Sequence, residues 1–183
     1  MTVHVYVAPG FEEVELITIV DVLRRADIDT VMVSLTAGTQ IQGAHQISVH
    51  ADAPFHQVAG QTPELIVLPG GGPGTQALLA HIDLHARLQA QISAGKRVAA
   101  ICAAPMVLAK IGLLQDKNAC CFPGCENTLL DGGANITAYN VVTDGLITTS
   151  RGAGTAGLFA LELVALLKNE AIAKEVGRTM LYL

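Results

Sequence analysis

Short runs of aliphatic and β-branched residues alternate along the chain with stretches of helical periodicity. The apolar runs predict strands over residues 3–7, 30–35, 64–68, 97–101, 118–121, 136–142 and 146–149. Spacing of 3.6 residues predicts helices over residues 12–26, 84–92, 105–111, 154–167 and 171–179. Residues 41–49 predict a short hairpin. This order indicates an α/β fold with a doubly wound, mainly parallel sheet and helices on both of its faces.

Composition agrees with one ordered domain. Of the 183 residues, 51% are hydrophobic and only 15% are charged, a balance that argues against disorder. The length predicts a single domain over residues 1–183. Aromatic residues make up 4% and tryptophan is absent, so we expect an aliphatic core of the kind found around buried parallel strands.

Charge and hydropathy limit the partners and the location. A net charge of −5 and a pI near 5.6 argue against a nucleic-acid partner. The uncharged stretch 98–109 is shorter than the roughly 18 apolar residues that a membrane span needs. The chain starts on a strand pattern with no basic segment before it, so we expect no secretory signal and a cytoplasmic location. The four cysteines are then expected to be reduced thiols.

The turn after the strand 97–101 carries the strongest candidate for chemistry. Ligands of open α/β sheets bind at the carboxyl ends of the strands. Here the strand leads into Cys102-Ala103-Ala104-Pro105, which is similar to a nucleophile elbow: an exposed side chain between small neighbours, followed at once by a helix. A helix N-terminus beside the sulfur predicts a lowered thiol pKa. A buried, inert cysteine explains the same residues equally well.

Two further strand ends offer groups that suit a thiol. The glycines Gly70, Gly71 and Gly72 follow a buried strand and could point main-chain N–H groups at an anion, or simply form a tight turn. After the first strand, Glu15 lies next to apolar residues of a helix. We expect its carboxyl to be partly buried, to stay protonated and to donate a hydrogen bond to a nearby sulfur.

The remaining polar clusters predict structure and not chemistry. His81 and His85 share a helix face but lack a third metal ligand. Cys120, Cys121 and Cys125 do not have the spacing of paired zinc motifs, so no metal site is expected. Arg151, after the last strand, could bind an anion, but a structural ion pair is the more usual role for such an arginine.

Four segments in order carry a family resemblance. They are Glu-Glu-Val-Glu at 12–15, Leu-Pro-Gly-Gly at 68–71, Ala-Ala-Ile-Cys-Ala-Ala-Pro at 99–105 and Thr-Ser-Arg-Gly-Ala-Gly-Thr at 149–155. Together they resemble the ThiJ/PfpI superfamily, in particular its DJ-one/YajL-like branch in bacteria. The resemblance implies a flavodoxin-like fold, a homodimer, a nucleophilic Cys102 and a protonated Glu15. It also implies an oxyanion and substrate pocket formed by Gly70, Gly71, Ala103 and Arg25.

The chain also departs from the pattern that it resembles. Phe122-Pro123 stands where the branch often has His-Pro, and His45 replaces a second interface arginine. The protease-like branch has a histidine directly after the nucleophile, where this chain has Ala103. Proteolysis and glutaminase activity are therefore not expected, because both would lack their base.

The resemblance and the residues together predict a carbonyl-processing enzyme that needs no cofactor, glutathione or metal. Cys102 would attack a 2-oxoaldehyde such as methylglyoxal and Glu15 would move protons, which gives a 2-hydroxy acid. Glycated side chains of proteins are a second substrate class for the same pocket. The alternative function is a redox-responsive chaperone or sensor of oxidative stress that acts through oxidation of Cys102. The third interpretation is a dimeric scaffold with a vestigial site.

Overall fold

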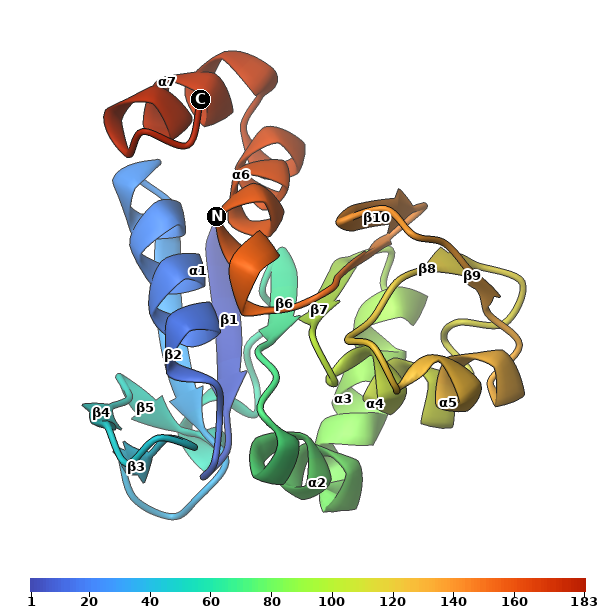
Figure 1. Cartoon of the computed structure of the whole chain (residues 1–183). Coiled ribbons are helices and arrows are strands. Elements are labelled where there is room, and N and C mark those ends of the chain that lie inside the picture. The colour runs from blue at the N-terminus through green and yellow to red at the C-terminus, as the bar shows by residue number, and fades with distance from the viewer.

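The central feature of the fold is a seven-stranded sheet in the order β10-β11-β7-β6-β1-β2-β5 (Figure 1). The computed structural model describes all residues 1–183. Only β10 runs antiparallel to its neighbour, β11, and the other pairs are parallel. The strands are β1 (Thr2–Val7), β2 (Asp29–Ser34), β5 (Ala53–Pro54), β6 (Leu65–Leu68), β7 (Arg97–Ile101), β10 (Val141–Asp144) and β11 (Ile147–Ser150).

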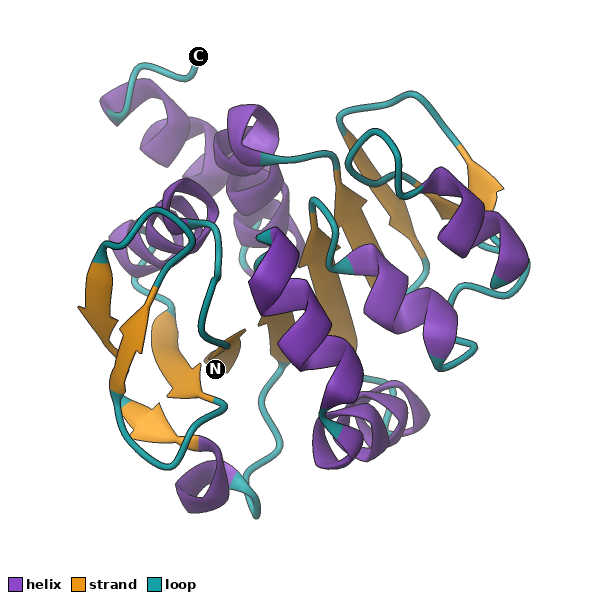
Figure 2. Ribbon diagram, turned by 60° about the horizontal axis from the view of Figure 1, so that its bottom comes forward, coloured by secondary structure: helices purple, strands orange, loops and turns teal.

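Helices cover both faces of this sheet (Figure 2). One face packs against α1 (Glu13–Arg25), α6 (Ala156–Leu167) and α7 (Glu170–Thr179). The other packs against α2 (Gly72–Ala80), α3 (Ile82–Ser93), α4 (Pro105–Lys110) and α5 (Glu126–Asp131). The strands divide their side chains between the two cores, so that Val67 joins the first core and Ile66 the second. The fold is therefore the doubly wound, flavodoxin-like α/β fold that the sequence predicts.

The winding direction changes between β1 and β6. From β1 the chain passes through α1 to β2 on one side, and β6 leads to β7 on the other side. The turns after β1 and β6 are held against each other, since the Glu12 N–H donates to the Gly70 carbonyl at 3.0 Å and the Gly74 N–H to the Gly10 carbonyl at 3.0 Å. Gly71 has a φ of +94° there, a conformation that favours glycine. This is the crevice in which such sheets bind ligands.

Small elements complete the chain. The strands β3 (Gln40–Gln42) and β4 (Ser48–His50) form an antiparallel hairpin, as predicted, and β8 (Asn118–Ala119) pairs in parallel with β9 (Asn135–Ile136). Two short 3₁₀ turns are η1 (Phe55–Val58) and η2 (Ala153–Thr155). None of the helices has both the length and the apolar character needed to cross a lipid bilayer.

Five local features differ from the expectations. The helices α2 and α5 and the short strand β5 were not predicted. The sequence predicts a turn at Gly72, Pro73 and Gly74. A helix starts there instead, because proline fits the first turn of a helix and the buried Leu78 anchors α2. A strand over residues 136–142 is wrong, because β9 ends at Ile136 beside β8 while β10 starts at Val141 beside β11. The strand predicted over 118–121 is shorter and ends at Ala119.

Candidate active site

Cys102 is the first residue after β7 and has a left-handed backbone, with a φ of +65°. That conformation is unfavourable for a side chain larger than glycine, so the surroundings must hold it. The Cys102 N–H donates to the Ser150 carbonyl at 3.0 Å, and the Cys102 carbonyl accepts from the Phe122 N–H at 2.8 Å. The side chain is half-buried and α4 starts at Pro105. This is the strand–turn–helix geometry of a nucleophile elbow.

Glu15 lies in the first turn of α1 and is completely buried. Its Oε2 accepts the Gly70 N–H at 2.8 Å, whereas its Oε1 has no hydrogen-bond partner although it is buried. Gly70 lets the acid approach the elbow, because a Cβ on Gly70 would lie 2.6 Å from the Cys102 Cβ and 2.9 Å from Glu15 Oε2. The carboxyl and the thiol are thereby close enough to share a hydrogen bond.

Burial raises the pKa of Glu15 from its ordinary 4.5 to about 7. The Gly70 N–H and the hydrogen bond with Cys102 favour the ionised form and oppose this shift, while the negative charge of Glu12 adds to it. An ionised carboxylate with one unpartnered buried oxygen is costly, and a proton removes that cost. Protonated and ionised Glu15 are therefore both present near neutral pH.

The pKa of Cys102 is raised to about 12, first by burial and then by the charge and hydrogen bond of Glu15. The main-chain N–H groups of Gly71 and Ala103 face the sulfur and act in the opposite direction. The expected lowering of this pKa is therefore wrong, because burial and a neighbouring carboxylate outweigh the amides. The two groups titrate as a pair, which loses one proton near pH 7 and the second only in strong alkali.

The structure brings five of the six predicted site residues together and leaves Arg25 apart. Cys102, Glu15, Gly70, Gly71 and Ala103 meet at the ends of β1, β6 and β7. Arg25 stands in the last turn of α1, ten residues after Glu15 and so about 15 Å further along the helix. Its Nε donates to Asp21 at 2.9 Å. Within one chain, Arg25 does not reach the sulfur.

A groove of about 320 Å³ lies beside the elbow and is lined by Phe122, Asn140, Arg151 and Thr155, among others. Phe122 links it to the elbow through the hydrogen bond to the Cys102 carbonyl. The structural ion pair expected for Arg151 is not formed, since the chain has no carboxylate within 4.0 Å of its guanidinium. Asn140 was missed because its loop has no pattern that marks it.

The two histidines of the pair and Cys120 each contact a neighbouring group of the chain. His81 caps α3 by accepting the Leu84 N–H at 3.1 Å, and the His85 ring contacts the Leu78 carbonyl at 3.1 Å. Each contact uses one nitrogen of the ring. The buried Cys120 sulfur lies 3.7 Å from the Thr149 hydroxyl.

The shared proton predicts the pH dependence of Cys102 alkylation. Below pH 7 both groups are protonated, and above it Glu15 can accept the thiol proton, so alkylation should rise with a midpoint near 7. In Glu15→Gln no base remains, and burial should keep the midpoint above the ordinary thiol value of 9.0. Iodoacetamide labelling, followed by peptide mass at Cys102, measures both midpoints. Equal midpoints in the two proteins would contradict the coupling.

Comparison with known proteins places this geometry in a family. The sequence model of the DJ-1/PfpI family matches residues 1–166. Protein dj-1beta of Drosophila melanogaster is 37% identical over 177 residues, which are 97% of this chain and 95% of that protein. Its crystal structure superposes with a TM-score of 0.94 at 36% identity and covers 98% of this chain and 97% of its own.

Two further relatives have names that describe a reaction. A protein of Pyrococcus abyssi named as a deglycase is 30% identical over 170 residues, which cover 92% of this chain and 100% of that protein. The glutathione-independent glyoxalase DJR-1.2 of Caenorhabditis elegans is 31% identical over 157 residues, 86% of this chain and 83% of that protein. The match over nearly the whole chain and the superposition of the fold show that the chain belongs to the DJ-1/PfpI family.

Proposed function

We propose that the protein is a cysteine-dependent enzyme that converts 2-oxoaldehydes, such as methylglyoxal and glyoxal, into 2-hydroxy acids without a cofactor. The observation that carries the proposal is the buried Glu15 carboxyl, which has one unpartnered oxygen and lies across Gly70 from the Cys102 side chain. An isomerisation that moves hydrogen between two carbons needs one group that both accepts and donates a proton. The names of the glyoxalase and deglycase relatives agree with this chemistry.

The first step joins the sulfur to the aldehyde carbon. Above pH 7, Cys102 and Glu15 together hold one proton. When the sulfur attacks, that proton is left on Glu15, whether the thiol or the carboxyl held it before. The electron pair of the C=O bond moves to the oxygen, which the N–H groups of Gly71 and Ala103 can stabilise because they already face the sulfur. Transfer of the Glu15 proton to this oxygen gives a neutral hemithioacetal and restores the carboxylate.

The second step moves a hydrogen between the two carbons. Glu15 removes the C–H proton from the former aldehyde carbon, and the electrons form an enediol with the neighbouring carbonyl. Glu15 passes this proton to the neighbouring carbonyl oxygen, which completes the enediol. It then moves the proton of the first hydroxyl to the neighbouring carbon, which gives the thioester of a 2-hydroxy acid. Water then cleaves the thioester, releases lactate from methylglyoxal and restores the Cys102 thiol. The sum is methylglyoxal plus water to lactate and a proton, with no oxidant or reductant.

Glycated side chains form a second substrate class for the same site. The early adduct of methylglyoxal with a Cys, Lys or Arg side chain holds the same pair of adjacent carbons. The half-buried sulfur and the open groove beside Phe122 and Arg151 leave room for a side chain carried by a protein. The Cys102 sulfur would displace the side chain from the former aldehyde carbon, and the side chain would leave with a proton from Glu15. The same isomerisation and hydrolysis would then release lactate and leave the side chain unmodified.

Lactate formation without glutathione tests the proposed reaction. Wild type should form lactate from methylglyoxal, and Cys102→Ala should form none because it cannot make the thioester. Glu15→Gln should lose about 10²–10⁴-fold in kcat, the usual contribution of a general acid and base. Cys125→Ala, a half-buried thiol elsewhere in the chain, is the matched control and should keep full activity. No lactate from folded wild type with a reduced Cys102 would refute the enzyme.

The same pocket favours a second candidate function, which is sensing of peroxide through Cys102. Sulfur attack on hydrogen peroxide gives a sulfenic acid and water, and a second peroxide gives a sulfinic acid. The Gly71 and Ala103 amides and a protonated Glu15 can hydrogen-bond the sulfinate oxygens as they would a carbonyl oxygen. Oxidation of Cys102 would then change the ability of the protein to act as a chaperone.

Mild peroxide distinguishes this candidate from the enzyme. A sensor should gain the mass of two oxygen atoms at Cys102 before its other three cysteines react, and its ability to keep a client protein soluble should change in step. Cys102→Ser should show neither effect. A Cys102 that stays reduced while other thiols oxidise would exclude the sensor.

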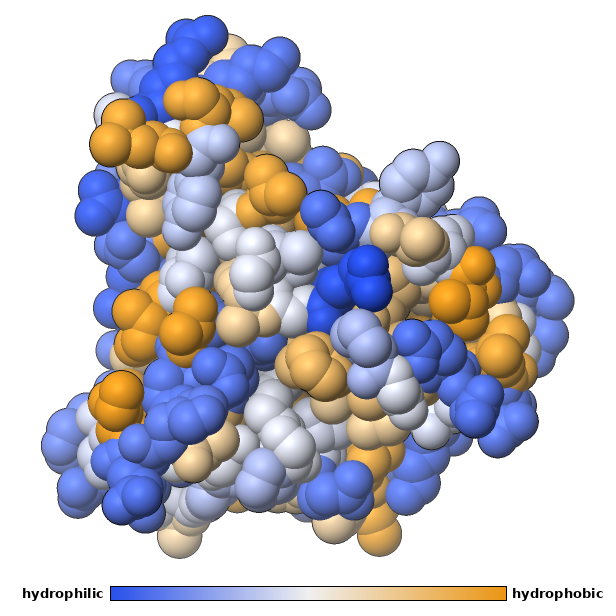
Figure 3. Space-filling model, in the orientation of Figure 1, coloured by the Kyte–Doolittle hydropathy of each residue, from blue (hydrophilic) through white to orange (hydrophobic).

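We also propose that the protein is a homodimer that pairs through the exposed side of α1. Val14 and Ile17 are 53% and 49% exposed on this helix, and Leu158 of α6 is 43% exposed beside it. The space-filling view shows apolar surface over this region (Figure 3). Arg25 lies on the same helix and is half-exposed.

Sedimentation equilibrium tests the dimer. Wild type should have twice the chain mass of 19.1 kDa, and Ile17→Asp should shift to the single-chain mass because it buries a charge at the interface. Ile82→Asp, at a more exposed position of α3 on the opposite layer, is the control and should remain dimeric. A wild type of single-chain mass would contradict the proposal.

A further inference from the structure

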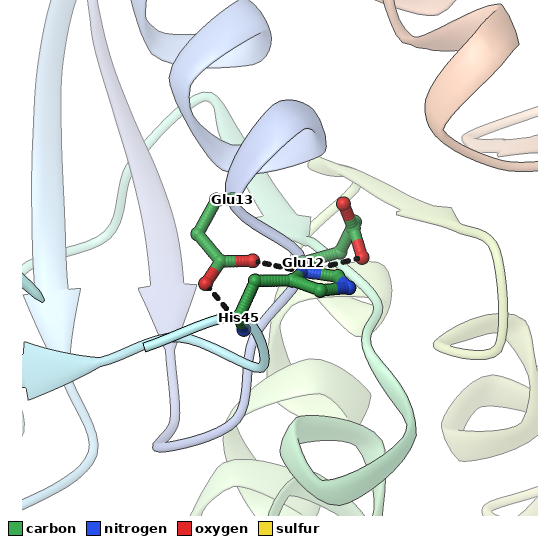
Figure 4. Close-up of side chains that lie close together, drawn as sticks. All are labelled: Glu12, Glu13 and His45. Carbon is green, nitrogen blue, oxygen red and sulfur yellow. Dashed lines mark hydrogen bonds and ion pairs between the residues drawn. The ribbon is translucent and has the colours of Figure 1, made fainter. Parts of the chain in front are cut away.

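Glu12, Glu13 and His45 bring two carboxylates and one imidazole together outside the Cys102 pocket (Figure 4). One potential ligand atom from each residue lies within 4.8 Å of the other two. His45 Nδ1 is 2.8 Å from Glu13 Oε2 and 3.8 Å from Glu12 Oε2. The acids stand at the start of α1, whereas His45 is at the tip of the β3–β4 hairpin, so the cluster joins two distant segments.

We propose that these three side chains bind one divalent transition-metal ion, with Zn²⁺ as the representative. Zinc is held by nitrogen and oxygen ligands at about 2.0–2.2 Å, so two ligands at a tetrahedral angle are roughly 3.3 Å apart. The distances of 2.8 and 3.8 Å bracket that separation, so small side-chain shifts would complete the site. Imidazole with carboxylates suits zinc and its neighbours better than calcium or magnesium.

Glu13 is already oriented as a ligand. Its side chain is only 7% exposed. Its Oε1 accepts the main-chain N–H of His45 at 2.6 Å, which leaves Oε2 for the ion. Gly43 makes room for it, because a Cβ at that position would overlap the carboxyl. A hydrogen bond that fixes a ligating carboxylate is the usual support of a metal site.

Glu12 gives a separate reason to expect a ligand. Its side chain is 19% exposed, and its carboxylate accepts no hydrogen bond from the chain. The nearest basic nitrogen is His45 Nδ1, at 3.8 Å from Glu12 Oε2. A pair of His45 and Glu13 alone would explain the shorter contact but would leave Glu12 without a partner. A shared ion satisfies both carboxylates.

The ion would be structural, because it links the β3–β4 hairpin to the start of α1. It takes no part in the reaction at Cys102, and the open fourth position would hold water. Because the ion would bind the folded chain and not the unfolded chain, it should raise the melting temperature. The site was hidden in the sequence because His45 is 32 residues away from Glu13.

Calorimetric titration with Zn²⁺ tests the site in three proteins. Wild type should bind one equivalent of Zn²⁺. His45→Arg should either not bind this ion or bind it more than about tenfold more weakly. Arginine keeps a cation beside both acids, so that the hairpin stays folded. His50→Ala removes an exposed histidine from the same hairpin and should keep the equivalent.

Thermal melting supplies the second measurement. Excess Zn²⁺ should raise the Tm of wild type and of His50→Ala but not that of His45→Arg. Free thiols could bind zinc in all three proteins, and only the difference between them reports on His45. Equal binding and equal Tm shifts in wild type and His45→Arg would overturn the proposal. Lactate formation is independent of this result.

Discussion

The contact between the Glu15 carboxyl and the Cys102 thiol is the interaction on which the site depends. A completely buried acid next to a half-buried thiol is unfavourable when both are ionised, so the two groups hold one proton between them near neutral pH. The contact requires Gly70, since any side chain there would collide with both partners. One small residue therefore allows the pair to act as nucleophile and base.

The fold supplies this contact through three strand ends. Glu15 is carried by the helix that follows β1, Gly70 by the turn after β6 and Cys102 by the elbow after β7. Neighbouring parallel strands end at the same edge, so residues far apart in sequence meet there. The hydrogen bond from the Glu12 N–H to the Gly70 carbonyl locks the first two turns together. Rigid strands thus position groups that a mobile loop would hold less well.

The sequence alone predicts the layers of the fold, because these follow from short-range patterns, whereas the family resemblance is what implies Glu15 and Gly71 as partners of the sulfur. Alternation in the apolar runs identifies the sheet, and the small residues around Cys102 and Gly70 mark strand ends. It does not predict the direction in which the Cys102 pKa shifts, because that depends on how deeply the sulfur is buried. It also misses His45 beside Glu13, because no local pattern connects a hairpin tip to a helix start.

The shared proton can be observed directly on Glu15. A ¹³C NMR titration of its carboxyl carbon, assigned by the loss of the signal in Glu15→Gln, reports its protonation without any reaction. The account predicts a midpoint near 7, far above the ordinary 4.5, and a change of that midpoint in Cys102→Ser. A midpoint near 4.5 that is unaffected by Cys102→Ser would show that the carboxyl is permanently ionised, and would contradict its role as the proton carrier.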